Sequence, residues 1–249
     1  MAPQQRDVRR ILVVALVLLA GCSGVFGSES QPDAPAVTPA PVPTSTTPDV
    51  ILPRTADGTP SVGLIITKHR QALSTRDFHR RTRIDETLST TDVWVDRDAD
   101  RTRVRRVTGT TTDVVVDGDR RYERAANGSV VSEPAASRLP AVRSASGFFL
   151  LQRYVAGLIY NRTDTVTRNG TELAVLRANT TDSTIDRAGY RTVEAADSTL
   201  YVDRDGVIRA LDHRERYADG TVRTLRFRVW TGGGSPAMPD WFEGRASDA

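Results

Sequence analysis

Hydrophobic and polar residues alternate with a period of two along several short stretches of the chain. In residues 225–230, Leu, Phe and Val occupy the odd positions, whereas Arg, Arg and Trp occupy the even positions. Residues 200–203 alternate in the same way, and in residues 101–105 Arg alternates with Thr and Val. Because successive side chains of a strand point to opposite faces, this pattern predicts β-strands with one apolar and one polar face.

Five tight-turn dipeptides separate such stretches: Asp117-Gly118, Asn127-Gly128, Asn169-Gly170, Asp205-Gly206 and Asp219-Gly220. Asn-Gly and Asp-Gly supply the positive φ that two-residue hairpin turns require. Their repeated use between short alternating segments predicts an antiparallel meander.

Two segments show helical spacing of apolar residues instead. The first runs from Ser61 to Ser74, with apolar-face positions at Val62, Ile65, Ile66, His69, Ala72 and Leu73. The second runs from Leu139 to Tyr160 and is broadly apolar, with Gly147 as a position for a break. A sheet with one polar face must cover its apolar face. The predicted fold is therefore α+β: a curved, half-barrel-like antiparallel sheet covered by two helices, with room for an apolar cavity between the layers.

The N-terminal 22 residues follow a different pattern. Arg6, Arg9 and Arg10 precede ten apolar residues at 11–20, and Leu19-Ala20-Gly21-Cys22 has the form of a lipobox. Ten residues are too few for a membrane span, which needs about 20. We expect residues 1–21 to be a lipoprotein signal peptide and Cys22, the only cysteine, to carry a lipid. This predicts a protein anchored on the extracellular face of the cell membrane. A buried N-terminal helix, or a signal peptide with a chance cysteine, is the alternative, and the paired arginines leave the export route open.

Residues 22–58 are rich in Pro, Thr and Ser and contain few large apolar side chains. Such a segment cannot bury enough apolar surface to offset the entropy of ordering it. We interpret it as a disordered stalk, followed by a single globular domain at 59–243 and a short tail at 244–249.

Charge narrows the range of partners. The formal net charge is +3, and removal of residues 1–21 lowers it to about +1, since three arginines and one aspartate are lost. Arginines alternate with aspartates and form no concentrated basic patch, which argues against nucleic-acid binding. On the strands, the arginines are expected to form a solvated outer face with cross-strand Asp–Arg pairs, with docking of anionic glycans or lipid head groups as the alternative.

Several features together resemble uncharacterised haloarchaeal lipoproteins: the lipobox, the stalk, the helix containing His69, the meander, the long middle helix and the terminal Pro239-Asp240-Trp241. The single lysine, Lys68, among abundant Arg and Asp is a compositional feature of the same group. The order of elements is also similar to the half-barrel carriers and receptors of bacterial lipoprotein sorting, and this resemblance implies a fold that holds acyl chains.

No residue set predicts catalysis, a resident cofactor or a metal. His69, His79 and His213 lack the spacing of metal ligands, and His69 is expected to be a buried, hydrogen-bonded structural residue. The segment from Asp96 to Asp100 lacks the Gly and Glu of a calcium loop and is interpreted as a turn. Four sequons at Asn127, Asn161, Asn169 and Asn179 are candidate N-glycosylation sites.

The second helical segment carries the main functional hypothesis. Its candidate residues are the run Phe148-Phe149-Leu150-Leu151 together with Val155, Leu158 and Ile159. They either line a cavity for an apolar ligand or fill the core, and core packing is the more common role of such residues. The sequence therefore predicts a non-enzymatic, lipid-anchored binding or carrier domain for an apolar ligand or lipid. A structural or interaction protein of the cell envelope with a filled core is the alternative, and an extracellular hydrolase has the least support.

Overall fold

The computed structural model describes residues 50–125, 127–135, 142–180, 185–186, 192–232 and 238–243. The chain divides into two units, residues 1–45 and 46–249, and every described residue belongs to the second. The predicted signal peptide, Cys22, the stalk as far as residue 49 and the tail at 244–249 lie outside the described residues. Within the described ranges, none of the helices has the length and apolar content needed to cross a membrane.

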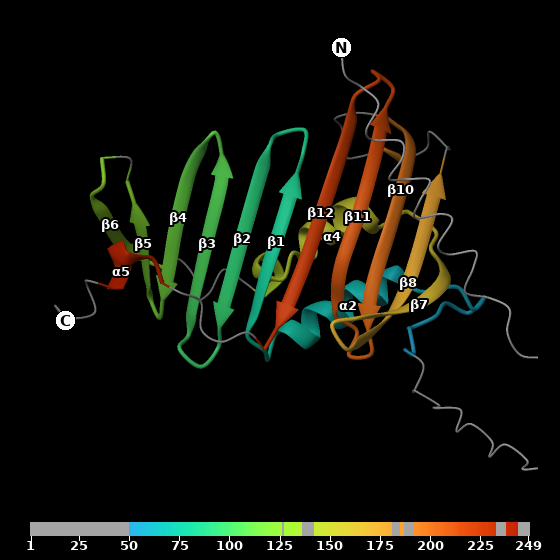
Figure 1. The fold of residues 1–249 in the computed structure, drawn as a ribbon, viewed down its shortest axis with the longest axis horizontal. Coiled ribbons are helices and arrows are strands. Elements are labelled where there is room, and N and C mark those ends of the chain that lie inside the picture. Colours follow the sequence, from blue (N-terminus) through green and yellow to red (C-terminus); the bar gives the residue numbers. More distant parts are fainter. Residues whose placement is uncertain are drawn as a thin grey trace, which may run out of the picture. The chain divides into compact units, whose positions relative to one another are not determined.

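The strands of the described residues form one antiparallel sheet (Figure 1). Its order is β6-β5-β4-β3-β2-β1-β12-β11-β10-β8-β7, and β9 pairs with β10 in addition. The strands are β1 Phe78–Ile84, β2 Ser89–Asp96, β3 Arg101–Thr108, β4 Thr110–Asp117, β5 Arg120–Arg124, β6 Val130–Pro134, β7 Asn161–Arg168, β8 Thr171–Thr180, β9 Ile185–Asp186, β10 Thr192–Asp203, β11 Ile208–Tyr217 and β12 Val222–Thr231. Most neighbouring strands of the sheet follow each other in sequence. The pairing of β1 with β12 is the exception that joins strands far apart in the chain.

All five Asn-Gly and Asp-Gly dipeptides lie at hairpin turns between strands that follow each other in sequence, which confirms the predicted antiparallel meander. The turn between β7 and β8 shows why the sequence signal is reliable. Asn169 and Gly170 have φ angles of 50° and 74°. A two-residue hairpin turn needs positive φ at both positions, which Asn and Gly adopt at least cost. The segment from Asp96 to Asp100 is likewise the turn between β2 and β3, and the backbone N–H of Ala99 donates to Asp96 Oδ1 at 2.9 Å.

Helices cover one face of this sheet. The helices on this face are α2 Val62–Leu73, α3 Val142–Ala145 and α4 Phe148–Val155. The short helix α5, Asp240–Glu243, lies on the opposite face, where the Phe242 ring contacts Tyr122 and the guanidinium of Arg101. Figure 1 shows α2 and α4 behind β1, β12 and β11. The face that they cover carries Phe227 and Leu211 and is called the covered face below. The opposite face carries Trp94, His79 and Trp230 and is called the outer face.

The core lies between these helices and the covered face. Ile65 and Ile66 of α2, Leu151 and Val155 of α4 and Phe227 of β12 are each at most 1% exposed. Full burial of a side chain of this size contributes about 1.5–3 kcal/mol relative to leaving it exposed. The predicted α+β architecture, an antiparallel sheet covered by helices, is confirmed.

The second helical segment is split at Gly147, as its sequence allowed. Gly147 has φ 82° and separates α3 from α4. A Cβ atom there would lie 2.7 Å from Phe227 Cε2 and 2.9 Å from Arg80 Nη1. Glycine therefore permits both the left-handed backbone and the close approach of the helix to the sheet. The helix ends at Val155, and Asn161 already belongs to β7.

The predicted boundary between stalk and domain is wrong. Val50 and Leu52 are 1% and 6% exposed and belong to the hydrophobic core. Arg162 Nη1 donates to the carbonyl oxygen of Val50 at 3.0 Å, and the backbone N–H of Ser61 donates to the carbonyl oxygen of Pro53 at 2.8 Å. The folded domain thus includes residues 50–58. The run Val50-Ile51-Leu52 between Pro48 and Pro53 is too short to establish a periodicity, so only tertiary contacts reveal that Val50 and Leu52 are buried while Ile51 is exposed.

Candidate functional site

A cavity of about 460 Å³ lies between α4 and the covered face of β1, β2 and β3. It is called the covered-face cavity below. It is lined by Arg80, Thr82, Ile84, Thr87, Ser89, Thr91, Arg106, Thr108, Ser144, Gly147, Phe149 and Leu150. The strand residues of this set recur at alternate positions, as expected for side chains that share one face of a sheet. The lining contains two arginines, several hydroxyl groups and three large apolar side chains, and it contains no carboxylate.

Arg80 is the buried cation of this cavity. Arg80 is 8% exposed, and its Nη1 donates to the carbonyl oxygen of Ser144 at 3.0 Å. Its Nε atom is buried without a hydrogen-bond partner. Burial, together with repulsion from Arg106, lowers the pKa of Arg80 to about 10. The guanidinium therefore still carries its charge at neutral pH, in a place where the charge is poorly solvated.

Arg106 of β3 faces the same cavity and is solvent-exposed. No described carboxylate forms an ion pair with Arg80 or Arg106, whereas Arg101 and Arg103 on the opposite face of β3 pair with Asp117 and Asp113 at 3.0 and 2.7 Å. The arginines of one strand thus have two different environments. Arg101 and Arg103 on the outer face form the cross-strand Asp–Arg pairs that the alternation predicted, and Arg106 on the covered face does not pair with a described carboxylate.

Phe149 and Leu150 supply the apolar wall of the cavity. Phe149 is 56% exposed, and Leu150 packs against the edge of the core. An exposed phenylalanine beside two guanidinium groups gives the cavity an apolar and a cationic part. Such a lining suits a ligand with an apolar chain and an anionic group, because each part meets a matching surface.

The other five apolar residues that the sequence singled out in this segment lie elsewhere. Leu151 and Val155 are fully buried and Leu158 is 7% exposed, all within the core. Phe148 packs against the core edge beneath the guanidinium of Arg70, whose Cζ lies 5.0 Å from the ring centroid. None of the five lines the covered-face cavity.

The prediction for Ile159 is wrong. This residue neither lines the covered-face cavity nor fills the core, because it follows the end of α4 at Val155 and is 77% exposed. Helical periodicity identified the buried stripe. The adjacent Phe149 and Leu150, which belong to the same apolar run, contact the cavity from the side of that stripe.

The three histidines lie in different parts of the domain. His69 is buried, as predicted: its Nε2 lies 3.0 Å from the carbonyl oxygen of Ser146, and its Nδ1 accepts from the backbone N–H of Ile208 at 3.1 Å. His79 lies on the outer face, where Nε2 is 2.7 Å from Asp92 Oδ1. His213 is buried on β11, 3.1 Å from a Glu215 oxygen. Among the described residues, no cluster of three or more His, Cys, Asp or Glu side chains could hold a metal ion.

The asparagines of the four sequons, Asn127, Asn161, Asn169 and Asn179, are all exposed. Asn127 and Asn169 lie in hairpin turns, as their sequence context predicted. Asn127 also has a structural role, because its Oδ1 accepts from the backbone N–H and the hydroxyl of Ser129 at 3.0 and 2.7 Å. Attachment of a glycan at any of the four stays a prediction.

No protein-family model and no curated protein matches the chain. The chain is similar to two mycobacterial proteins of known structure, each with a TM-score of 0.42. The Mycobacterium tuberculosis lipoprotein LppX is 11% identical, and the match covers 71% of this chain and 98% of LppX. LprF from Mycobacterium bovis is 12% identical over 73% of this chain and 99% of LprF. A LolA superfamily protein from Nitrosomonas europaea is 10% identical, with a TM-score of 0.27, over 73% of this chain and 99% of that protein.

Proposed function

We propose that the protein is a non-enzymatic, lipid-anchored carrier or binding protein for an anionic amphiphile, such as a fatty acid, held in the covered-face cavity. The observation that carries this proposal is the buried Arg80, with an unpartnered Nε, beside Arg106 in a cavity without a carboxylate. The cavity volume of about 460 Å³ falls within the usual range for small-molecule sites.

Electrostatics favour an anionic ligand over a neutral one. A buried charge without an ion-pair partner is costly, and the folded protein carries that cost at Arg80, where attraction by Asp92 offsets only part of it. A bound carboxylate or phosphate would offset it by accepting charge-assisted hydrogen bonds from the guanidinium. The repulsion between Arg80 and Arg106 would decrease at the same time.

The apolar part of the ligand would lie on Phe149, Leu150 and Ile84. These side chains and the two arginines line one cavity, so a single amphiphile could contact both. Each buried methylene group would contribute about 0.8 kcal/mol. A chain of several carbons is therefore required for tight binding, and a short anion such as acetate is expected to bind weakly.

Binding of oleate to the purified domain tests the proposal, with oleyl alcohol as a ligand of equal chain length and no charge. Isothermal titration is expected to give saturable oleate binding that Arg106→Gln weakens about 10- to 100-fold, the loss expected for about 1.4–2.8 kcal/mol. Arg105→Gln is the matched control, because Arg105 is the adjacent residue of β3 on the outer face. Equal binding of oleate and oleyl alcohol, or equal effects of the two substitutions, would contradict the proposed recognition of an anion.

Anchoring through Cys22 is a separate part of the proposal. The lipobox supports it, and two acyl chains would be needed for stable attachment. Cys22→Ser is expected to leave uncleaved precursor or to release soluble protein from cells. Normal processing of this variant, together with wild-type membrane fractionation, would refute the lipoprotein interpretation.

The alternative is a structural or interaction protein of the cell envelope. It is favoured by the filled core beneath α4, where Leu151 and Val155 have no exposed surface. The same titration separates the two functions. Absence of saturable oleate binding to the folded domain would leave this alternative as the better account.

A further inference from the structure

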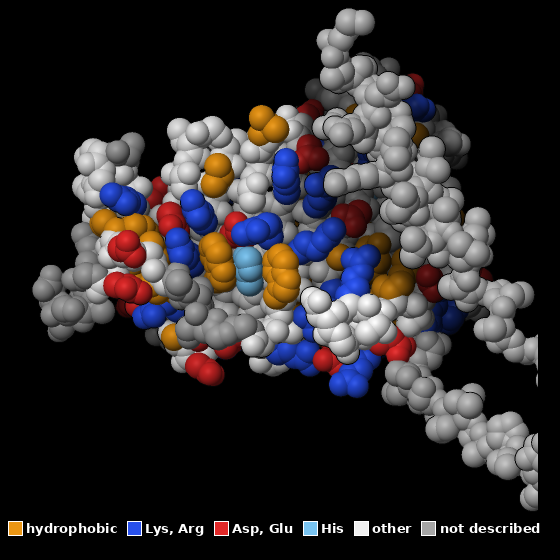
Figure 2. Space-filling view, in the orientation of Figure 1, with side chains coloured by type: hydrophobic (Ala, Val, Ile, Leu, Met, Phe, Trp, Pro, Cys, Tyr) orange, Lys and Arg blue, Asp and Glu red, His pale blue; other side chains and the backbone are white. Residues whose placement is uncertain are grey.

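A row of stacked side chains crosses the outer face. His79 of β1 lies between Trp94 of β2 and Trp230 of β12, with ring centroids 4.7 and 4.9 Å apart and interplanar angles of 5° and 21°. The guanidinium of Arg103 on β3 lies 5.0 Å from the Trp94 ring centroid. Figure 2 shows this arrangement as one histidine between two hydrophobic side chains, with basic side chains around them.

The stack is held in position at its central ring, His79. Asp92 Oδ1 lies 2.7 Å from His79 Nε2 and accepts from Arg81 Nε at 2.7 Å, so the imidazole is fixed between its neighbours. Both faces of the imidazole are covered, and Arg103 covers the second face of Trp94. The second face of Trp230 is directed away from His79, toward β11, and no ring or guanidinium of the described residues stacks on it. Trp230 is 43% exposed, which is unusual for a large aromatic side chain in the middle of a sheet.

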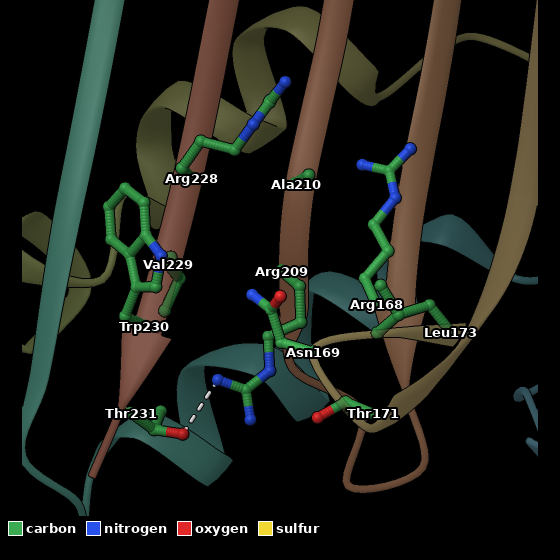
Figure 3. Close-up of a pocket in the computed structure, with 10 residues that line it drawn as sticks. All are labelled: Arg168, Asn169, Thr171, Leu173, Arg209, Ala210, Arg228, Val229, Trp230 and Thr231. Carbon is green, nitrogen blue, oxygen red and sulfur yellow. Dashed lines mark hydrogen bonds between the residues drawn. The ribbon is translucent and has the colours of Figure 1, made fainter. Parts of the chain in front are cut away.

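This free face of Trp230 borders a second cavity of about 460 Å³, called the outer-face pocket below. Figure 3 shows Trp230 on one side of it, Arg168 and Leu173 on the other, and the small Ala210 between them. Ala210 leaves the space open because its side chain ends at Cβ. The complete lining is Arg168, Asn169, Thr171, Leu173, Arg209, Ala210, Arg228, Val229, Trp230 and Thr231, without a carboxylate.

Two of the three arginines are held by neighbours. Arg209 Nε donates to Asp203 Oδ2 at 2.7 Å, and its Nη1 donates to Thr231 Oγ1 at 2.8 Å. Arg228 Nη2 contacts both carboxylate oxygens of Asp212 at 2.7 and 3.0 Å, and Nη1 donates to the carbonyl oxygen of Leu211 at 3.1 Å. These contacts hold the cations in place before any ligand binds, which lowers the entropic cost of binding.

Arg168 is the third cation. Its guanidinium lies over the ring of Tyr201, 4.1 Å from the centroid, and no described carboxylate pairs with it. Three cations therefore meet at the pocket, and two of them have carboxylate partners that do not line it. The pocket keeps a positive charge beside an exposed aromatic face.

We propose that the outer-face pocket binds an acidic sugar unit of a polysaccharide. The apolar C–H face of a pyranose ring would stack on the free face of Trp230. Its carboxylate or sulfate group would accept hydrogen bonds from Arg168 and the neighbouring guanidiniums, which suit bidentate recognition of such groups. The neutral polar side chains of Asn169, Thr171 and Thr231 line the same pocket and match the hydroxyl groups of a sugar.

The surroundings of the pocket favour a sugar over a lipid chain. Apart from Trp230, the exposed side chains near it are mainly charged or hydroxyl-bearing, so an acyl chain would find little apolar surface to cover. Asn169 belongs both to the lining and to a sequon, so a glycan attached there would occupy the pocket mouth. The test therefore requires protein from a bacterial host that attaches no N-glycan.

The test is titration of the folded domain with an oligogalacturonate, its methyl ester, and a sulfated oligosaccharide at low salt. Esterification removes the charge and keeps the ring, so the ester is expected to bind at least tenfold more weakly than the acid. Trp230→Ala and the exposed Arg168→Gln are each expected to weaken binding at least tenfold. Arg226→Gln, on the same strand and face as Arg228 but outside the lining, is the matched control and is expected to leave binding unchanged.

Equal binding of the acid and its ester would overturn the proposal, and so would equal effects of Arg168→Gln and Arg226→Gln. It would also be overturned if a nucleoside monophosphate bound more tightly than either acidic saccharide, or if neither acidic saccharide showed saturable binding. Thermal unfolding of each variant establishes that it is folded, and Arg168→Gln keeps the test valid if Trp230→Ala unfolds. This inference is independent of the covered-face cavity, because Arg106→Gln should weaken oleate binding and leave saccharide binding unchanged.

Discussion

His69 is expected to make the protein acid-sensitive. The imidazole is fully buried between α2, the segment at Ser146 and β11. Its Nδ1 accepts a hydrogen bond from the Ile208 N–H, so the proton of the neutral ring is on Nε2, which donates to the Ser146 carbonyl. Protonation of Nδ1 would break the contact with Ile208 and place a charge in the core. Burial, the largest cause, and the nearby cations Arg80 and Arg209 lower the pKa of His69 to about 4.

The sign and size of the effect follow from this pKa. An unfolded histidine titrates near 6.5, so below that pH the unfolded chain binds a proton that the folded protein excludes. Stability contributed by neutral His69 is therefore complete above pH 6.5 and is lost as the pH falls toward 4. At 1.36 kcal/mol per pH unit, the loss between about pH 7.5 and pH 5 is about 2 kcal/mol.

Urea unfolding of wild type and His69→Gln at these two pH values measures this contribution. Glutamine does not titrate but keeps a donor and an acceptor, so the variant is expected to be less stable at pH 7.5 by about 1–3 kcal/mol. The difference in stability between the two proteins should decrease by about 2 kcal/mol at pH 5. Carboxylates titrate in both proteins, so their contributions cancel in this comparison.

Two results would refute this reasoning. The first is an equal loss of stability on acidification in wild type and His69→Gln. The second is an imidazole of His69 that titrates near 6.5 in the folded protein, as followed by its NMR chemical shifts.

Three further predictions concern the packing of the domain. Gly147→Ala is expected to destabilise the protein by about 2–4 kcal/mol in urea unfolding, because it combines a strained positive φ with a Cβ 2.7 Å from Phe227; an unchanged midpoint would contradict the close approach. Deletion of residues 26–45 should shift the thermal midpoint by less than about 3 °C, whereas Val50→Ala should lower the free energy of unfolding by about 1–3 kcal/mol. A deletion that destabilises the domain more than Val50→Ala does would place the domain boundary elsewhere. Leu151→Ala should lower the free energy of unfolding by about 2–5 kcal/mol without changing the intrinsic affinity for oleate, because Leu151 fills the core and does not line the covered-face cavity. Loss of oleate binding in the folded variant would contradict this.

Local signals in the sequence predicted the local structure. The Asn-Gly and Asp-Gly dipeptides identified hairpin turns because the positive φ that they supply is a property of the residues themselves. Helical spacing identified α2, and Gly147 was recognised as a position for a break. The buried role of His69 followed from its position on the apolar face of that helix. These predictions held because each depends on residues only a few positions apart.

The sequence indicated Phe149 and Leu150 of the covered-face cavity as part of an apolar run, but it did not identify the two arginines of this cavity. Alternation showed that the strands carry arginines on polar faces, but Arg80 and Arg106 lie on the covered face, where the pattern alone predicts apolar side chains. Their unpaired state depends on which carboxylates are nearby in space. The stacking of Trp94, His79 and Trp230 could have been suspected from aromatic residues at polar-face positions, but its geometry requires β1 to pair with both β2 and β12.

The sequence by itself determined the turns, the helical segments and the alternation of faces. Tertiary structure alone decided that Val50 and Leu52 belong to the core, that β1 pairs with the distant β12, and which side chains line the two cavities. The physical reason is the range of the interactions. Backbone conformation and amphipathic periodicity are set by neighbours along the chain, whereas burial, ion pairing and the solvation of a charge such as that of Arg80 depend on segments brought together only by folding.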